Sequence, residues 1–144
     1  MKLLFLILFS LFFSCGKSPF LKTPSSEQRV ILPQMPEEGL YFENENLSIT
    51  HYFSSEIIIG EEVSMAVVFS DAQGRLRDPK AHFSMKLWMP DMGHGSFPIT
   101  IKKASTGIYE ASDIFFTMPG YWDVHFELEK EDQIIDEVLW GIDL

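Results

Sequence analysis

The chain has 144 residues, a length that suits one domain with short extra segments and leaves no room for two large cores. Its formal net charge is −10 and its basic residues form no cluster, which argues against nucleic acid as a partner, because such binding depends on neutralising phosphates. A single cysteine excludes an intrachain disulfide, while thirteen phenylalanines and many β-branched residues favour strands over helices.

The first fifteen residues have the pattern of a secretion signal. Lys2 precedes an apolar run over residues 3–13, which is short for a hydrocarbon core of about 30 Å but suits the apolar part of a signal peptide. The run ends at Ser14-Cys15, which resembles the lipobox of bacterial lipoproteins. We therefore expect residues 1–14 to be removed and Cys15 to carry a lipid that anchors the protein at the extracytoplasmic side of a bacterial membrane. The alternatives are an uncleaved N-terminal anchor and an ordinary signal peptide followed by a spare cysteine.

The composition changes after the expected lipid site. Residues 15–38 are rich in serine, threonine and proline and show little periodicity, which is typical of a flexible tether. Alternating apolar and polar residues then begin, so we expect the folded domain to cover residues 39–144.

Short alternating segments follow one another through this domain. Alternation with a period of two predicts strands, and turn residues such as Gly74 and Gly107 separate them. About seven strands at regular spacing, with no convincing helix, predict an all-β immunoglobulin-like sandwich. The expected strands cover residues 47–53, 63–69, 81–89, 97–101, 108–116, 122–128 and 134–142.

Two expected strand ends carry the residues that point to chemistry, because functional side chains often lie on loops held by a rigid scaffold. The first end supplies Met89, Met92 and His94, and the second supplies Met118. Thioether sulfur is a soft ligand and imidazole is a common copper ligand. This set without cysteine therefore favours Cu(I) over zinc, magnesium or calcium.

The same four residues also have structural interpretations. Met89 shares its expected face with core residues, so it would cap the core. Met92 and Met118 would then close the end of the sandwich as flexible apolar plugs. His94, which lies between two glycines, would hydrogen-bond its own loop.

The other histidines are expected to be structural. His51 lies on an apolar face, which predicts a hydrogen-bonded histidine in the core or at its rim, whereas His82 and His125 lie on polar faces and are expected at the surface. Neither a Gly-x-Ser-x-Gly motif nor a phosphate-binding glycine pattern is present. We therefore expect that the protein is not an enzyme.

The motifs around the candidate ligands resemble a known family. Residues 89–95 read Met-Pro-Asp-Met-Gly-His-Gly, and residues 118–124 read Met-Pro-Gly-Tyr-Trp-Asp-Val. Together with residues 79–81 and 107–109, they resemble the YtkA-like/FixH-like domain over about residues 45–130. FixH proteins usually carry a transmembrane helix, whereas this chain has a lipobox, so the YtkA-like branch is the closer match.

The resemblance implies an extracytoplasmic, immunoglobulin-like domain that is linked to copper handling or to cytochrome oxidase assembly. By position it implies Met89, Met92, His94 and Met118 as candidate ligands, with Trp122 packed behind them. A copper protein or an oxidase assembly factor is then the implied partner.

Two functions follow as hypotheses. The first is a lipid-anchored accessory or metallochaperone-type protein that binds Cu(I) through these methionines and His94. The second is a metal-free interaction module of the cell envelope, whose partner contacts would include Trp88 and Tyr121.

Overall fold

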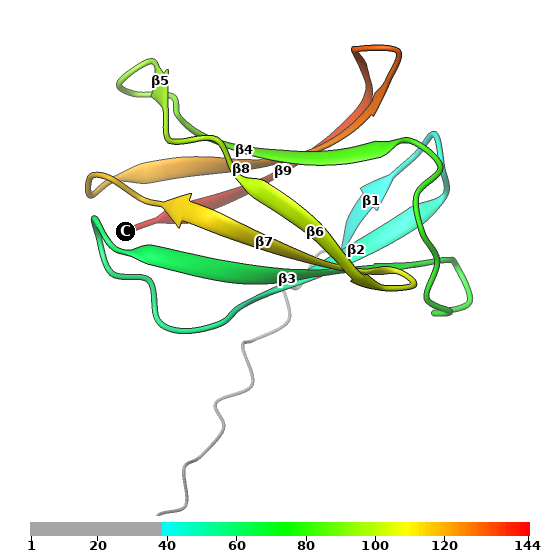
Figure 1. Ribbon diagram of the computed structural model, residues 1–144. Helices are drawn as coiled ribbons and strands as arrows, with labels where there is room; N and C mark the ends of the chain where they lie inside the picture. Colours follow the sequence, from blue (N-terminus) through cyan, green and yellow to red (C-terminus); the bar gives the residue numbers. More distant parts are fainter. Residues whose placement is uncertain (1–38) are drawn as a thin grey trace, which may run out of the picture. The chain divides into compact units, whose positions relative to one another are not determined.

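The computed structural model describes residues 39–144, which form nine β-strands and no helix (Figure 1). Within that range no helix is long and apolar enough to cross a membrane. The expected signal peptide, Cys15 and the tether lie outside the described residues. The strands are β1 (Leu40–Phe42), β2 (Leu47–Phe53), β3 (Glu62–Ser70), β4 (His82–Met89), β5 (His94–Gly95), β6 (Thr100–Ser105), β7 (Ile108–Phe115), β8 (Tyr121–Lys130) and β9 (Gln133–Asp143).

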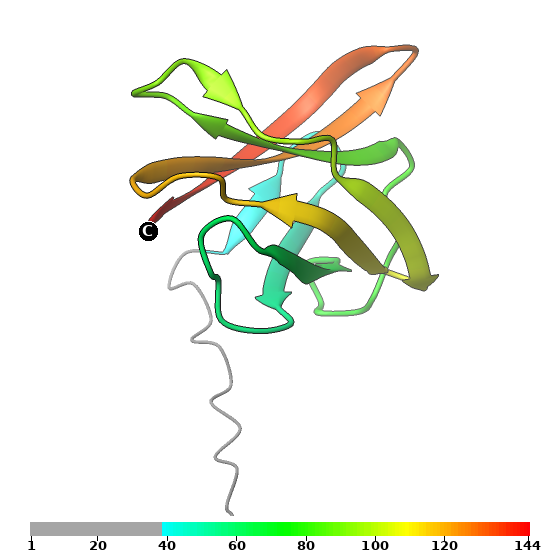
Figure 2. The same cartoon turned by 60° about the vertical axis from the view of Figure 1, so that its left-hand side comes forward.

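The strands form two antiparallel sheets that pack face to face. One sheet has the order β1-β2-β3-β7-β6 and the other has the order β5-β4-β8-β9. Figure 2 shows β8 and β9, coloured orange to red, in a different layer from β2 and β3. Without the short strands β1 and β5, four strands face three in the order of an immunoglobulin constant-type sandwich. The predicted fold class is confirmed.

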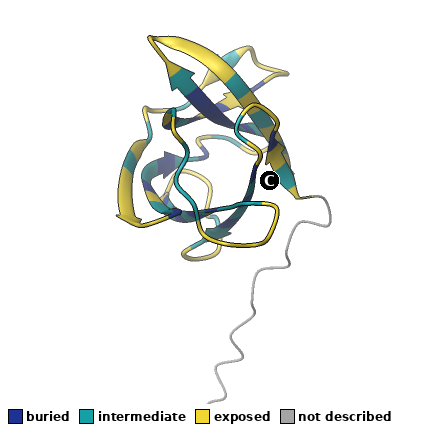
Figure 3. Ribbon diagram, turned by 90° about the vertical axis from the view of Figure 1, so that its right-hand side faces the viewer, coloured by how far each residue is buried: buried dark blue, intermediate teal, exposed yellow. Residues whose placement is uncertain are grey.

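The core lies between the sheets because apolar residues alternate along each strand. In β3, Val63, Met65, Val67 and Phe69 are buried while the residues between them are partly exposed. This alternation puts one face of each strand into the core and leaves the other toward solvent. Figure 3 shows the same division in colour, with buried segments in dark blue beside exposed segments in yellow.

The strand boundaries differ from the expectation in two respects. Strands β1 and β5 have three and two residues, too few to show an alternating pattern. The strand expected over residues 97–101 instead begins at Thr100, and Phe97 is exposed. Pro98 accounts for this shift, because proline has no N–H to donate to a neighbouring strand.

The turn at Gly107 offers a test of this packing. Gly107 has a φ of +69°, and an added Cβ would lie 2.8 Å from the backbone nitrogen of Arg77 and from the carbonyl oxygen of Phe69. We expect Gly107→Ala to lower the free energy of unfolding by about 3 kcal/mol. Gly74 has a similar φ of +74° with nothing within 4 Å, so Gly74→Ala should cost only about 1 kcal/mol. Chemical denaturation measures both, and equal losses would contradict the clash.

Candidate functional site

A tight turn at one end of the sandwich brings the first candidate ligands together. Strand β4 ends at Met89, and the amides of Met92 and Gly93 donate to the Met89 carbonyl at 3.2 and 2.9 Å. Gly93 has a φ of +66°, which glycine adopts without strain. The chain then returns as β5, in which His94 is the direct partner of Met89. Residues directly opposite each other in an antiparallel pair share a face, so His94 lies on the core-facing side with Met89.

Trp122 joins this turn to the loop that carries Met118. Its side chain is fully buried at the start of β8, and its ring lies edge-on to the His94 ring with centroids 6.2 Å apart. Its Nε1 donates to the carbonyl oxygen of Met118 at 3.0 Å. A Cβ added at Gly120 would lie 2.7 Å from the Met89 methyl carbon, so the buried Met89 reaches the same loop. Residues of the turn and of the loop therefore meet around one tryptophan.

The four expected ligands differ in their surroundings. Met89 is buried, and Met118 is partly buried and packs against the core. Met92 is 61% exposed at the turn between β4 and β5. The structure thus brings Met89, His94 and the backbone of Met118 to the region around Trp122, and it leaves Met92 at the surface of the turn.

The hydrogen bonding of His94 fixes which ring nitrogen is free to bind a ligand. Nδ1 lies 3.0 Å from the carbonyl oxygen of Gly95. A carbonyl oxygen only accepts, so Nδ1 carries the proton, and the Nε2 lone pair of the neutral ring is left for a metal. A backbone carbonyl is one of the groups that orient histidine ligands in this way.

The two expected partner contacts lie on the other face of the same sheet. Trp88 and Tyr121 are both exposed, and they alternate with the inward-facing Met89 and Trp122 along β4 and β8. Trp88 is paired with Asp123, whose negative charge raises the pKa of Tyr121. The inward-facing candidate ligands Met89 and His94 and the candidate partner contacts therefore lie on opposite faces of the sheet.

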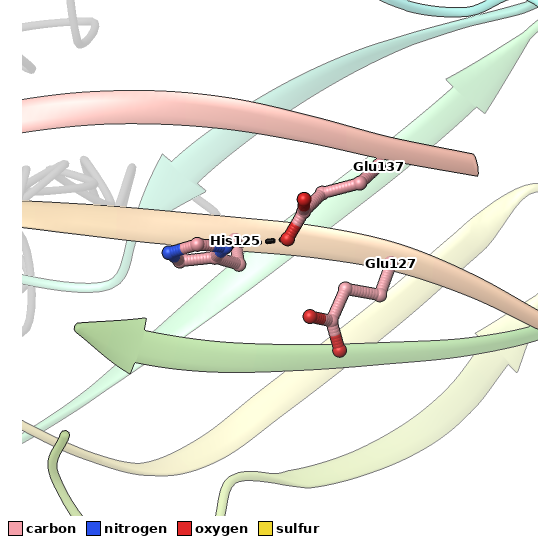
Figure 4. Close-up of side chains that lie close together, drawn as sticks. All are labelled: His125, Glu127 and Glu137. Carbon is pink, nitrogen blue, oxygen red and sulfur yellow. Dashed lines mark hydrogen bonds and ion pairs between the residues drawn. The ribbon is translucent and has the colours of Figure 1, made fainter. Parts of the chain in front are cut away.

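The outer face of this sheet also holds a cluster that the sequence did not reveal. His125 and Glu127 lie on β8 and Glu137 lies on β9, and each contributes one donor atom to a group whose members all lie within 4.8 Å of one another (Figure 4). The Nδ1 of His125 is 2.5 Å from Glu137. The side chain of His125 is only 14% exposed, so it is not the plain surface residue that its place on a polar face suggested. His82, in contrast, is exposed as expected.

Lys86 of β4 contributes the positive charge nearest to this cluster. Its Nζ forms an ion pair with Glu127 and lies 3.7 Å from Glu137. The hydrogen bond to Glu127 raises the pKa of Lys86, and the hydrogen bond from His125 lowers the pKa of Glu137. The sequence pattern did place His125 and Glu127 on one face. It did not predict Glu137 beside them, because that depends on the register of β9.

The structure is thus an antiparallel β-sandwich in which methionine and histidine residues gather at one end. The chain belongs to the YtkA-like family, whose model matches residues 43–127, more than half of the sequence. The matched segment includes the β4–β5 turn, Met118 and Trp122, and it confirms the resemblance read from the motifs. The comparison with curated proteins gave no match.

Proposed function

We propose that this YtkA-like protein is a lipid-anchored accessory protein of the cell envelope that binds Cu(I) for delivery or sequestration. One observation carries the proposal: His94 faces Met89 across β4 and β5, and the loop of Met118 is hydrogen-bonded to the Trp122 that borders them. Soft and borderline donors from two separate chain segments thus lie at one end of the domain.

The donor set suits Cu(I). Thioether sulfur is soft, and the neutral imidazole of His94 has Nε2 free of the Gly95 hydrogen bond. We assign Met89, Met92, His94 and Met118 as the ligands. Met89 is the donor most tightly held by packing, and Met92 is the donor most open to solvent. An exposed donor suits an ion that is passed on, because it leaves an incoming ligand a route to the metal.

The anchor and the partner complete the proposal. The apolar run that ends at Ser14-Cys15 supports a lipid on Cys15, and two or more acyl chains give stable attachment to a membrane. The protein would then act on the extracytoplasmic side, without enzyme activity of its own. A copper protein or an oxidase assembly factor is the partner class that fits this role.

A Cu(I) competition titration against a chromophoric chelator, under anaerobic reducing conditions, tests the site. We expect His94→Ala and Met118→Leu each to weaken Cu(I) binding by roughly tenfold or more, because each removes a donor. Met92→Leu should weaken it as well. Met85→Leu is the matched control, since Met85 is a buried methionine of the same strand that faces Phe126, and it should leave the affinity unchanged. Parent protein that binds Cu(I) no more tightly than a His94→Ala/Met92→Leu variant would refute the proposal.

The interaction module is the second candidate function. It is favoured by the exposure of Trp88 and Tyr121 on one outer face, because aromatic side chains are enriched at protein interfaces. In that function the inward-facing His94 would have no part. If the parent protein does not bind Cu(I) in the titration, this second function remains a candidate.

A further inference from the structure

The pairing of β8 with β9 places two carboxylates side by side. Glu127 and Glu137 are direct partners in the antiparallel register, and like charges in that position destabilise a sheet. Glu127 is also only 5% exposed, so its charge is poorly solvated. A buried carboxylate of this kind requires a positive charge close to it.

His125 adds a nitrogen donor to the same place. It lies two residues before Glu127 on the same face of β8, and its Nδ1 donates a hydrogen bond to Glu137, so a bound cation would take the place of the Nδ1 proton. Figure 4 shows the imidazole and the two carboxylates close together on two neighbouring strands, with His125 and Glu137 in direct contact. One imidazole nitrogen with two carboxylate oxygens suits Zn²⁺ or Cu²⁺, whereas Mg²⁺ and Ca²⁺ take oxygen ligands.

The charge around the cluster favours a divalent cation over the single lysine. Lys86 brings one positive charge, but Ser84 links Glu127 to a third carboxylate, because its hydroxyl contacts both Glu127 and Glu129. Two carboxylates thus share one ammonium, with a third nearby, in a chain whose formal net charge is −10. Lys86 is about half exposed, so its flexible stem allows the ammonium to move into solvent when an ion enters.

We propose that His125, Glu127 and Glu137 form a binding site for a divalent transition-metal cation, and that Lys86 leaves the cluster when the cation binds. The site shares no residue with the proposed Cu(I) ligands and lies on the opposite face of the sheet from Met89 and His94. It therefore stands or falls independently of the proposed function.

A Zn²⁺ titration of the purified full-length protein, in competition with a chromophoric zinc chelator, tests the site. The parent should bind one Zn²⁺, and His125→Ala should weaken binding by roughly tenfold or more. Lys86→Met should tighten binding, because it removes the competing ammonium. His82→Ala is the matched control, since His82 is an exposed histidine of the same sheet paired with Glu129, and it should leave the affinity unchanged.

The thermal melting temperature gives a second readout, because a ligand that binds the folded state stabilises it. Zn²⁺ should raise the melting temperature of the parent and of His82→Ala, but not that of His125→Ala. The proposal is overturned if His125→Ala binds Zn²⁺ as the parent does, or if Lys86→Met binds it more weakly. It is also overturned if His94→Ala removes Zn²⁺ binding, since the ion would then lie at the proposed Cu(I) site.

Discussion

Replacing Trp122 with alanine should lower the free energy of unfolding by about 4 kcal/mol, as expected for the removal of a large buried aromatic side chain. Trp122 is fully buried, and its ring packs edge-on against Phe116 with centroids 5.8 Å apart and against His94. Its loss leaves a cavity between the β4–β5 turn and the loop that carries Met118. Urea denaturation followed by far-ultraviolet circular dichroism measures the effect.

Trp122→Phe separates the packing of the ring from its hydrogen bond. Phenylalanine keeps an aromatic ring in the core but cannot donate to the Met118 carbonyl, so we expect a smaller loss of about 2 kcal/mol. If the phenylalanine variant is as unstable as the alanine variant, the hydrogen bond rather than burial holds the two segments together.

The alternating pattern was sufficient to predict the sandwich and most of its core. The expected face of β3, with Val63, Val67 and Phe69, is the buried face, because burial on one side of a strand imposes a period of two on the sequence. The same reasoning placed Met89 on the inward face with the core residues. The positions of the β4–β5 turn and of the Met118 loop at strand ends followed from the turn residues in and around them.

Features that depend on register could not be predicted in this way. Glu137 meets Glu127 only because the β8–β9 pairing contains an irregularity between Leu128 and Glu129, and a shift of one residue reverses the face of every side chain. The proximity of Met89 to Gly120 likewise depends on the register of β4 with β8, its neighbour in the same sheet. Local patterns carry no information on either distance.

His51 shows a different limit of the sequence pattern. Its place on an apolar face correctly predicted burial, but the expected hydrogen bond is missing at Nδ1, which is buried and has no partner among the described residues. Aromatic rings surround it, with the centroid of Trp140 at 4.4 Å and that of Phe126 at 5.5 Å. A polar group that lacks a partner in such a place destabilises the fold, and it also makes the fold sensitive to pH.

Acidification from pH 7 to pH 4 should therefore destabilise the protein through His51. Burial lowers the pKa of His51 from 6.5 to about 4, so between these values the unfolded chain binds a proton that the folded chain does not. Stability falls as the pH falls through this window and the contribution levels off below about pH 4. The gap between the two pKa values corresponds to about 3 kcal/mol.

The comparison with His51→Leu isolates this contribution from that of the carboxylates. Asp71, Asp78 and Glu137 have lowered pKa values, so their contributions are lost mainly at the acid end of the range and are common to both proteins. Urea denaturation at several pH values should show that the parent loses about 3 kcal/mol more than His51→Leu between pH 7 and pH 4. Parallel pH profiles would mean that the His51 ring is protonated in the folded state, which would require an opening of the aromatic cluster around it.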